Sequence, residues 1–175
     1  MLQTAIFDED MNFISYFNYT NETIARNLYQ AVCDCRKTND IRVIAYILPG
    51  SLPRCDNMSS SDRQALSRAM NYDLEDVKAL PISSIFDDNK FVLRIFDNTV
   101  TKVYIETDGI MSGMATIRKF QNVNHLKSKL VQSWKWESEL INIFDLYYRD
   151  IKLEPQICFY DYKIPENAVI HYKPI

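Results

Sequence analysis

The chain has 175 residues, the length of about one ordinary domain, with 47% hydrophobic and 25% charged residues. These values are typical of a globular protein and exclude collagen-like, coiled-coil and predominantly disordered chains. The net charge of −3 argues against a polycationic nucleic-acid-binding protein, and the three glycines form no GxGxxG or P-loop motif.

The N-terminal part of the chain predicts a strand pair, a helix and a buried strand. Residues 4–7 and 11–17 have the alternation of two strands joined by an acidic turn. A helix is expected over 21–37, with Thr20 as its N-cap. Residues 41–48 are almost wholly apolar, which predicts a central strand buried on both faces. The apolar stripe expected for the helix consists of Ile24, Leu28, Val32 and Cys35.

The middle of the chain predicts a loop and two helical segments. Residues 51–60 contain Pro53 and several serines and form the expected loop, the best candidate for mobility. Ser61 begins a segment with capping-box spacing and is expected to open a helix. Residues 73–80 are expected to form a second, short set of helical turns that ends at Pro81.

A three-stranded meander is expected next. Residues 91–96 and 99–107 have strand character and are separated by Asp97-Asn98, which predicts an antiparallel hairpin. The dipeptide Asp108-Gly109 is preferred in type I′ turns and links this hairpin to a third strand over 110–117.

Helices and a second hairpin are expected in the C-terminal part. Residues 123–134 have helical spacing of apolar side chains, and a second or bent helix is expected to continue to 151. Strands over 157–162 and 168–172 are expected to close the chain as a hairpin. The apolar positions that suggest the continued helix are Ile141, Phe144, Tyr148 and Ile151.

These elements together predict an α+β fold. About eight strands, mostly antiparallel, and three or four helices are expected in a single compact domain over residues 1–175. The sequence contains no recognisable internal repeat.

The N-terminal residues and the cysteines favour an intracellular location. The N-terminus carries acidic residues where a signal peptide needs basic ones, and no stretch has the length of a membrane-spanning segment. We therefore expect an intracellular protein, cytoplasmic or within a virion, with no disulfide. The four cysteines, expected to be reduced, are Cys33, Cys35, Cys55 and Cys158.

Three parts of the sequence are candidates for catalytic or metal-binding sites. The acidic turn 8–10 offers carboxylates for Mg²⁺ or Ca²⁺, but adjacent acids in a short turn do not converge on one ion, which favours a solvated turn. Residues 88–90 resemble the D-x-K end of a two-metal nuclease motif, with Asp108 or Glu106 as possible further ligands, but no Pro-Asp pair on a preceding strand supports this. Cys55 follows a basic residue, yet no spacing brings His125 or His171 to it as a base. We therefore expect no catalytic, metal or cofactor site.

The most unusual feature is a basic segment over 118–136. It contains five basic residues and no acidic one, so the rest of the chain carries −8. If a helix continues through the segment, Lys127 and Lys135 share a face, and Trp136 lies off the core stripe. Such a face could bind RNA or an anionic membrane, with a solvated surface as the alternative. The candidate binding residues are Arg118, Lys119, Lys127, Lys129, Lys135 and Trp136.

In the order of its expected elements the chain resembles the matrix proteins of rhabdoviruses. The resemblance lies in a strand, a helix and a strongly apolar strand over 11–17, 21–37 and 41–52. It continues in two adjacent strands, a helix and a closing hairpin over 91–172. It implies a non-enzymatic structural protein of a virion that self-associates, condenses the nucleocapsid and brings it to a membrane.

Two other functions remain open. The chain could be an intracellular adaptor or host-modulating module whose sheet edge or helix groove binds one protein partner. It could also be a hydrolase that uses Cys55 or an acidic cluster. The expected partners are therefore a second copy of the chain, a nucleoprotein or RNA, an anionic membrane surface, or a host protein.

Overall fold

The computed structural model describes residues 2–48, 58–87 and 90–175. In this part of the chain, ten strands form two mixed sheets of five strands each, with four α-helices and two 3₁₀-helices, which confirms the predicted α+β class. The chain divides into two compact units, Met1–Asn98 and Thr99–Ile175. Each unit contains one complete sheet and its own hydrophobic core.

The first unit has the strand order β2-β1-β5-β3-β4. Strand β1 is antiparallel to β2 and parallel to β5, and β3 lies between its antiparallel neighbours β5 and β4. This confirms the expected central strand. The elements are β1 (Leu2–Phe7), β2 (Phe13–Tyr19), α1 (Ala25–Arg36), β3 (Ile41–Ile47), α2 (Ser60–Ser67), β4 (Asn71–Asp73), α3 (Ile82–Phe86) and β5 (Phe91–Asp97).

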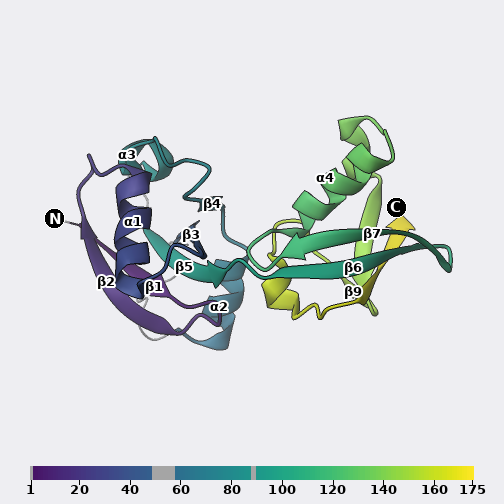
Figure 1. Cartoon of the computed structure of the whole chain (residues 1–175), viewed down its shortest axis with the longest axis horizontal. Coiled ribbons are helices and arrows are strands. Elements are labelled where there is room, and N and C mark those ends of the chain that lie inside the picture. Colours follow the sequence, from purple (N-terminus) through teal and green to yellow (C-terminus); the bar gives the residue numbers. More distant parts are fainter. Residues whose placement is uncertain (1, 49–57, 88–89) are drawn as a thin grey trace. The chain divides into compact units, whose positions relative to one another are not determined.

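Helix α1 lies against one face of this sheet (Figure 1). Its buried residues include Leu28 and Val32, which belong to the same hydrophobic core as Val43 and Leu93 of the central strands. At full burial, each such aliphatic side chain contributes about 1.5–3 kcal/mol. The apolar stripe of the helix therefore holds it to the sheet.

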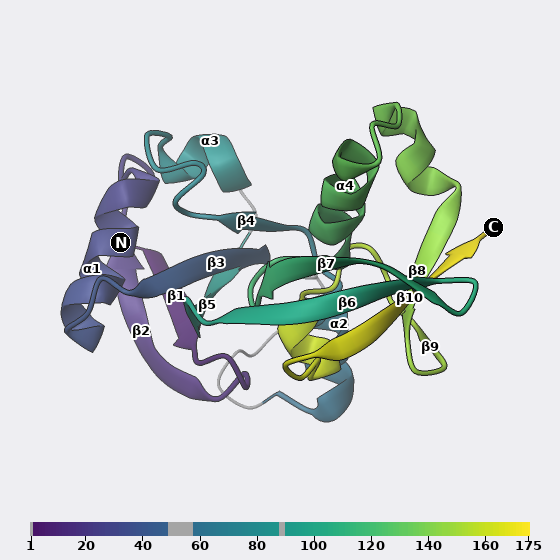
Figure 2. The same cartoon turned by 45° about the vertical axis from the view of Figure 1, so that its right-hand side comes forward.

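The second unit has the strand order β7-β6-β10-β8-β9. Strand β6 is antiparallel to β7 and parallel to β10, while β8 is antiparallel to β10 and β9. Figure 2 shows β6, β7 and β10 side by side. The elements are β6 (Val100–Thr107), β7 (Ile110–Arg118), α4 (Val123–Ser133), the 3₁₀-helix η1 (Ser138–Asn142), β8 (Phe144–Tyr148), β9 (Ile151–Lys152), the 3₁₀-helix η2 (Phe159–Tyr162) and β10 (Ala168–Pro174).

The β6–β7 turn and helix α4 form as the sequence predicts. Asp108 and Gly109 have φ values of 52° and 79°, the positive values that a type I′ turn needs at both central residues. Helix α4 begins after Asn122, whose side chain accepts a hydrogen bond from the backbone N–H of His125. Its buried residues Leu126 and Leu130 pack on the core of the unit.

The two units share one topology. In each, a hairpin is followed by a helix, the last strand lies parallel to the first, and the strand order is second, first, fifth, third, fourth. Strand β7 therefore occupies in the second unit the edge position that β2 occupies in the first. The sequence has no recognisable repeat, so the correspondence between the two units is visible only in the strand pairing.

The predicted meander is wrong at its first turn. Strands β5 and β6 are joined by Asn98 and Thr99 but do not pair, because β5 lies between β1 and β3 while β6 lies between β7 and β10. Both strands find partners distant in sequence within their own sheets.

Two predictions for the C-terminal part are also wrong. The segment expected to be helical up to residue 151 contains η1, β8 and β9. The expected closing hairpin is absent as well, because 159–162 form the 3₁₀-helix η2 and β10 pairs with β6 and β8.

The remaining differences concern helix ends. Helix α1 starts at Ala25, and Thr20 instead shares a hydrogen bond with Thr23, while Cys35 is exposed and Cys33 takes the expected core position. The N-cap of helix α2 is Ser59, two residues before the expected cap, Ser61.

Two more expectations involve the middle of the chain. Residues 74–80 form turns without a helix, and α3 follows Pro81. Most of the expected loop over 51–60 lies outside the described residues.

The single domain expected from the length stays a prediction. Two units with separate cores can still unfold as one cooperative domain, and that property is measured by unfolding rather than by strand pairing.

Candidate partner-binding edge of the second unit

Strand β7 is an edge of its sheet and pairs with β6 alone among the described strands. It has nine residues, no proline and a single charged residue, Arg118 at its end. Folded proteins usually protect edge strands with charges, prolines or short length. Apart from Arg118, β7 lacks these three features, and its one bulge lies near its N-terminal end, so the part from Gly113 onward can accept another strand.

The backbone of β7 presents hydrogen-bonding groups at the free edge. Lys102 of β6 directs its backbone to the other side, because its N–H donates to the Glu166 carboxylate at 3.0 Å and its carbonyl accepts from the Asn167 N–H at 2.8 Å. Thr116 lies opposite Lys102, and opposite residues of an antiparallel pair direct their backbone groups either toward or away from each other. Thr116, and Met114 two residues earlier, therefore point N–H and C=O outward.

Large apolar side chains of β7 are exposed. Ile110 is 70%, Met111 55% and Met114 60% exposed. Single exposed apolar residues are ordinary, but three on one edge strand form an unusual concentration of apolar surface. Methionine suits such a surface, since its flexible side chain adapts to different neighbours.

A groove of about 550 Å³ runs between this edge and α4. The volume lies in the range of about 300–1,000 Å³ that is typical of binding sites. Lys129 lies in the groove, and its Nζ donates to the Thr116 carbonyl at 3.1 Å. The groove is lined by Met114, Ala115, Thr116, Lys129, Leu130, Gln132 and Ser133.

Lys127 contradicts the predicted basic face. The residue is only 3% exposed, and its Nζ lies 4.9 Å from the centre of the Phe144 ring. Burial lowers the pKa of this ammonium group, while nearby Asp145 opposes that shift. A side chain that packs in the core cannot belong to a surface that binds RNA or membranes.

The prediction that Lys127 and Lys135 share a helix face is also wrong, because α4 ends at Ser133 and Lys135 has a positive φ of 58°. Trp136 is 37% exposed and lies off the helix, with its ring centroid 4.9 Å from that of Trp134. The predicted binding residues therefore lie at several separate places in the second unit.

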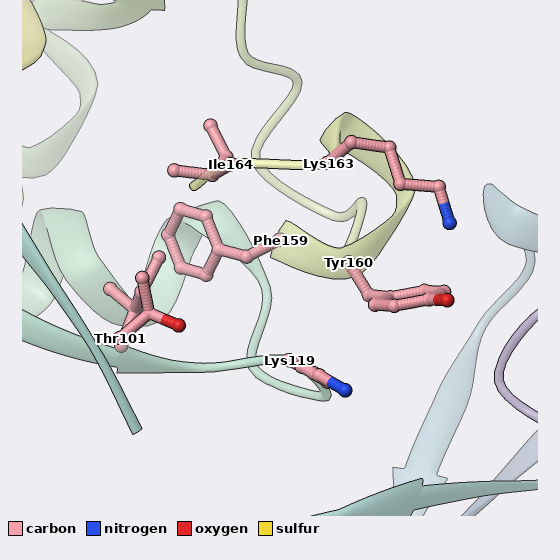
Figure 3. Close-up of a pocket in the computed structure, with 7 residues that line it drawn as sticks. Thr101, Lys119, Phe159, Tyr160, Lys163 and Ile164 are labelled. Atoms are coloured by element: carbon pink, nitrogen blue, oxygen red, sulfur yellow. The ribbon is translucent and has the colours of Figure 1, made fainter. Parts of the chain in front are cut away.

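Lys119 lines a second, smaller pocket (Figure 3). The Tyr160 ring lies between the lysine side chains, with the Lys119 Nζ 5.3 Å and the Lys163 Nζ 3.6 Å from its centre. Phe159 and Ile164 supply apolar walls. The volume of about 220 Å³ is below the usual range for ligand sites, so the edge groove is the better candidate.

The histidines and the acidic turn have local partners. A ring nitrogen of His125 lies 3.1 Å from the Gln121 amide, and His171 Nδ1 lies 3.1 Å from the Glu106 carboxylate. The Asp8 carboxylate accepts hydrogen bonds from the backbone of Asp10 and Asn12, which gives the solvated turn favoured by the sequence.

The described residues contain no cluster of metal-ligating side chains, since no group of three His, Cys, Asp or Glu side chains among them is placed to hold a metal ion. Cys33, Cys35 and Cys158 form no disulfide among the described residues, and the Cys158 thiol donates to the Asp161 carboxylate at 3.3 Å. Cys55 and most of the segment 88–90 lie outside the described residues.

In the part of the chain that the structure covers, no helix combines the length and the apolar character needed to cross a membrane.

Sequence reasoning missed the exposed apolar residues of β7. The expected strand over 110–117 was correct, but the sequence does not indicate whether a strand lies at the edge or in the middle of a sheet. The available signal was the density of methionine in a strand that contains a glycine, Gly113, and almost no charge.

No family model and no curated protein matches the chain. One similar solved structure is the N-terminal ubiquitin-like domain in the 4931431F19Rik protein, at 13% identity and a TM-score of 0.39, with 45% of this chain and 78% of that chain covered. Another is a de novo designed protein based on ubiquitin, at 16% identity and a TM-score of 0.38, with 43% and 88% covered. The resemblance to rhabdovirus matrix proteins stays a prediction.

Proposed function

We propose that this protein is a non-enzymatic interaction protein that binds an extended segment of a partner as an added strand on β7. The observation that carries the proposal is the unprotected edge of β7, with outward backbone groups and exposed Ile110, Met111 and Met114. In strand addition, main-chain hydrogen bonds provide affinity and side-chain pockets provide specificity. The groove beside α4 supplies such a pocket.

A phage-displayed library of linear peptides, selected on the full chain, tests this proposal. Enriched peptides should bind the wild type and lose at least tenfold in affinity with Met114→Lys, because a lysine on the edge opposes an added strand. Ile151→Lys is the matched control: Ile151 is 56% exposed but lies on β9, which has two residues. Absence of enriched peptides, or equal losses with both variants, would contradict the proposal.

A self-associating matrix protein is a second candidate function. It is supported by the exposed Trp136 next to Lys135, since an indole with a neighbouring cation is suited to an anionic membrane surface. Lys129→Glu with Lys135→Glu should weaken sedimentation with acidic liposomes and lower its salt dependence, whereas Trp136→Ala should weaken binding without changing that dependence. Unchanged binding by the lysine variant would remove this candidate.

A further inference from the structure

We infer that the partner strand on β7 is β7 of a second copy of this chain, paired antiparallel about a two-fold axis at Met114. The inference rests on the proposed function, because it names the occupant of the same edge. Closed two-fold dimers are the commonest assemblies of identical chains, and they use one self-complementary surface. The free edge of β7 is self-complementary in three respects: its charges, its backbone hydrogen-bonding groups and its exposed apolar side chains.

The charges at the ends of β7 select the antiparallel orientation. Asp108 precedes the strand, while Arg118 and Lys119 lie at its other end. Parallel pairing of two copies would place Asp108 beside Asp108 and Arg118 beside Arg118. Antiparallel pairing places the acidic end of each copy beside the basic end of the other, so unlike charges meet twice.

The backbone selects the register. With Met114 opposite Met114, two outward-facing residues meet and can exchange two N–H···O=C bonds. Arg118 then lies toward the end of the second copy's β7 that carries Asp108. A register centred on Thr116 is less suitable, because it would bring the two Lys129 side chains, each hydrogen-bonded to its own Thr116 carbonyl, together at the axis.

The apolar residues of β7 gain cover in this register. Met114 of each copy meets its equivalent at the axis, where each side chain covers the other. The pairing is short, since a bulge between β6 and β7 makes the edge irregular beyond Gly113. A reversible, concentration-dependent dimer is therefore expected rather than a permanent one.

Cysteine cross-linking tests the register. In the full chain with Cys35→Ser and Cys55→Ser, Met114→Cys should form a disulfide-linked dimer under mild oxidation. Equivalent Cα atoms at the axis would lie about 5.5 Å apart, which is within the usual span of a disulfide. Thr116→Cys is the matched control, because its two copies would be about 13 Å apart, four residue steps along the pair.

Sedimentation velocity over a concentration series tests the dimer without cross-linking. The wild type should shift from monomer to dimer, Met114→Lys should remain monomeric, and Ile151→Lys should behave as the wild type. A wild type that remains monomeric at every concentration, or equal cross-linking by Met114→Cys and Thr116→Cys, overturns the inference. In that case, peptides from the library that still depend on Met114 would show that the edge binds a different protein and that the proposed function stands.

Discussion

At the scale of single residues, Lys127 is the clearest case of a charge whose environment differs from its sequence context. It lies on the buried side of α4, its hydrocarbon stem packs with the core, and its ammonium lies over the Phe144 ring. Long basic side chains often bury the stem and direct the charge toward solvent or an acid. Here the burial lowers the pKa of Lys127, so the folded state disfavours the charged form.

Lys127→Glu is therefore expected to lower the free energy of unfolding by about 3 kcal/mol, since it buries an unpaired carboxylate close to Asp145. Lys127→Met should be at least as stable as the wild type, because it keeps the packing and removes the buried charge. Lys129→Glu, the control on the same helix, should change stability by no more than about 0.5 kcal/mol. Urea denaturation measures all three, and equal stability of the two glutamate variants would contradict the burial argument.

Tyr29 shows how one hydroxyl connects α1 to the sheet. Its OH donates to the backbone carbonyl of Ile41 at 2.9 Å. Burial raises the pKa of Tyr29 to about 12, with a further contribution from its hydrogen bond to Cys33. The folded chain thus keeps this proton at pH values where an unfolded tyrosine, with a pKa near 10, has released it.

Because the unfolded chain releases the proton first, the stability that Tyr29 contributes is complete below about pH 10 and is lost as the pH rises toward 12. Tyr29→Phe should cost about 1 kcal/mol at neutral pH through the lost hydrogen bond. It should also reduce the fall in stability above pH 10. Denaturation of both proteins at neutral and alkaline pH checks this, and parallel pH profiles would refute it.

At the scale of secondary structure, two serines near the start of α2, Ser59 and Ser61, both fit the spacing of a capping box. Ser59 Oγ accepts from the Asp62 N–H at 3.2 Å, and the Asp62 carboxylate accepts from the Ser59 N–H at 3.2 Å. This reciprocal pair is a capping box with aspartate in the place of the usual glutamate. The sequence predicted Ser61 as the cap because its spacing to Gln64 also fits the motif.

Ser59→Ala should consequently destabilise the protein by about 1 kcal/mol, as loss of an N-cap usually does. Ser61→Ala is the matched control, since Ser61 is exposed within the first turn and should have a much smaller effect. Thermal denaturation distinguishes the two positions. A larger loss at Ser61 would show that the helix begins where the sequence placed it.

Elements defined by local signals were predictable. The hairpin turn at Asp108 and Gly109, the buried strand β3 and helix α4 depend on turn preferences and on apolar patterns within a few residues. Their sequence signals agree with the tertiary structure. Elements whose identity depends on distant partners were not predictable in this way.

The C-terminal errors illustrate that limit. Ile141, Phe144, Tyr148 and Ile151 recur at three and four residues, which matches a helix, but they belong to η1, β8 and β9. A short helical turn followed by two strands can produce the same spacing. Likewise, adjacent strands usually pair, so β5 and β6 looked like a hairpin although they belong to different sheets.

At the scale of the whole molecule, the two units have the same strand order, but the sequence did not predict which strands lie at the sheet edges. The sequence contained the strand of the candidate site but not its position at a sheet edge, which depends on the pairing of β6 with β10. It also grouped basic residues by proximity in sequence, whereas the structure places Lys127 in a core and Lys119 beside Tyr160. Proximity in sequence does not show which side chains share a surface where a helix ends and the chain turns.

The separate cores make a prediction about cooperativity. Leu93 of β5 and Leu146 of β8 are both fully buried, but Leu93 belongs to the core of the first unit and Leu146 to that of the second. Replacing either with alanine should cost about 2–5 kcal/mol through lost burial and the cavity that remains. Because no residue is common to the two described cores, we expect each substitution to weaken only its own unit.

Hydrogen exchange of the full chain, followed by mass spectrometry, measures this directly. Leu93→Ala should accelerate exchange in β1, β3 and β5, and Leu146→Ala in β6, β8 and β10, with protection in the other unit unchanged. The matched chemistry of the two substitutions makes each the control for the other. If either one accelerates exchange in both sheets equally, the chain unfolds as the single domain that its length predicts, and the separation of the cores has no energetic counterpart.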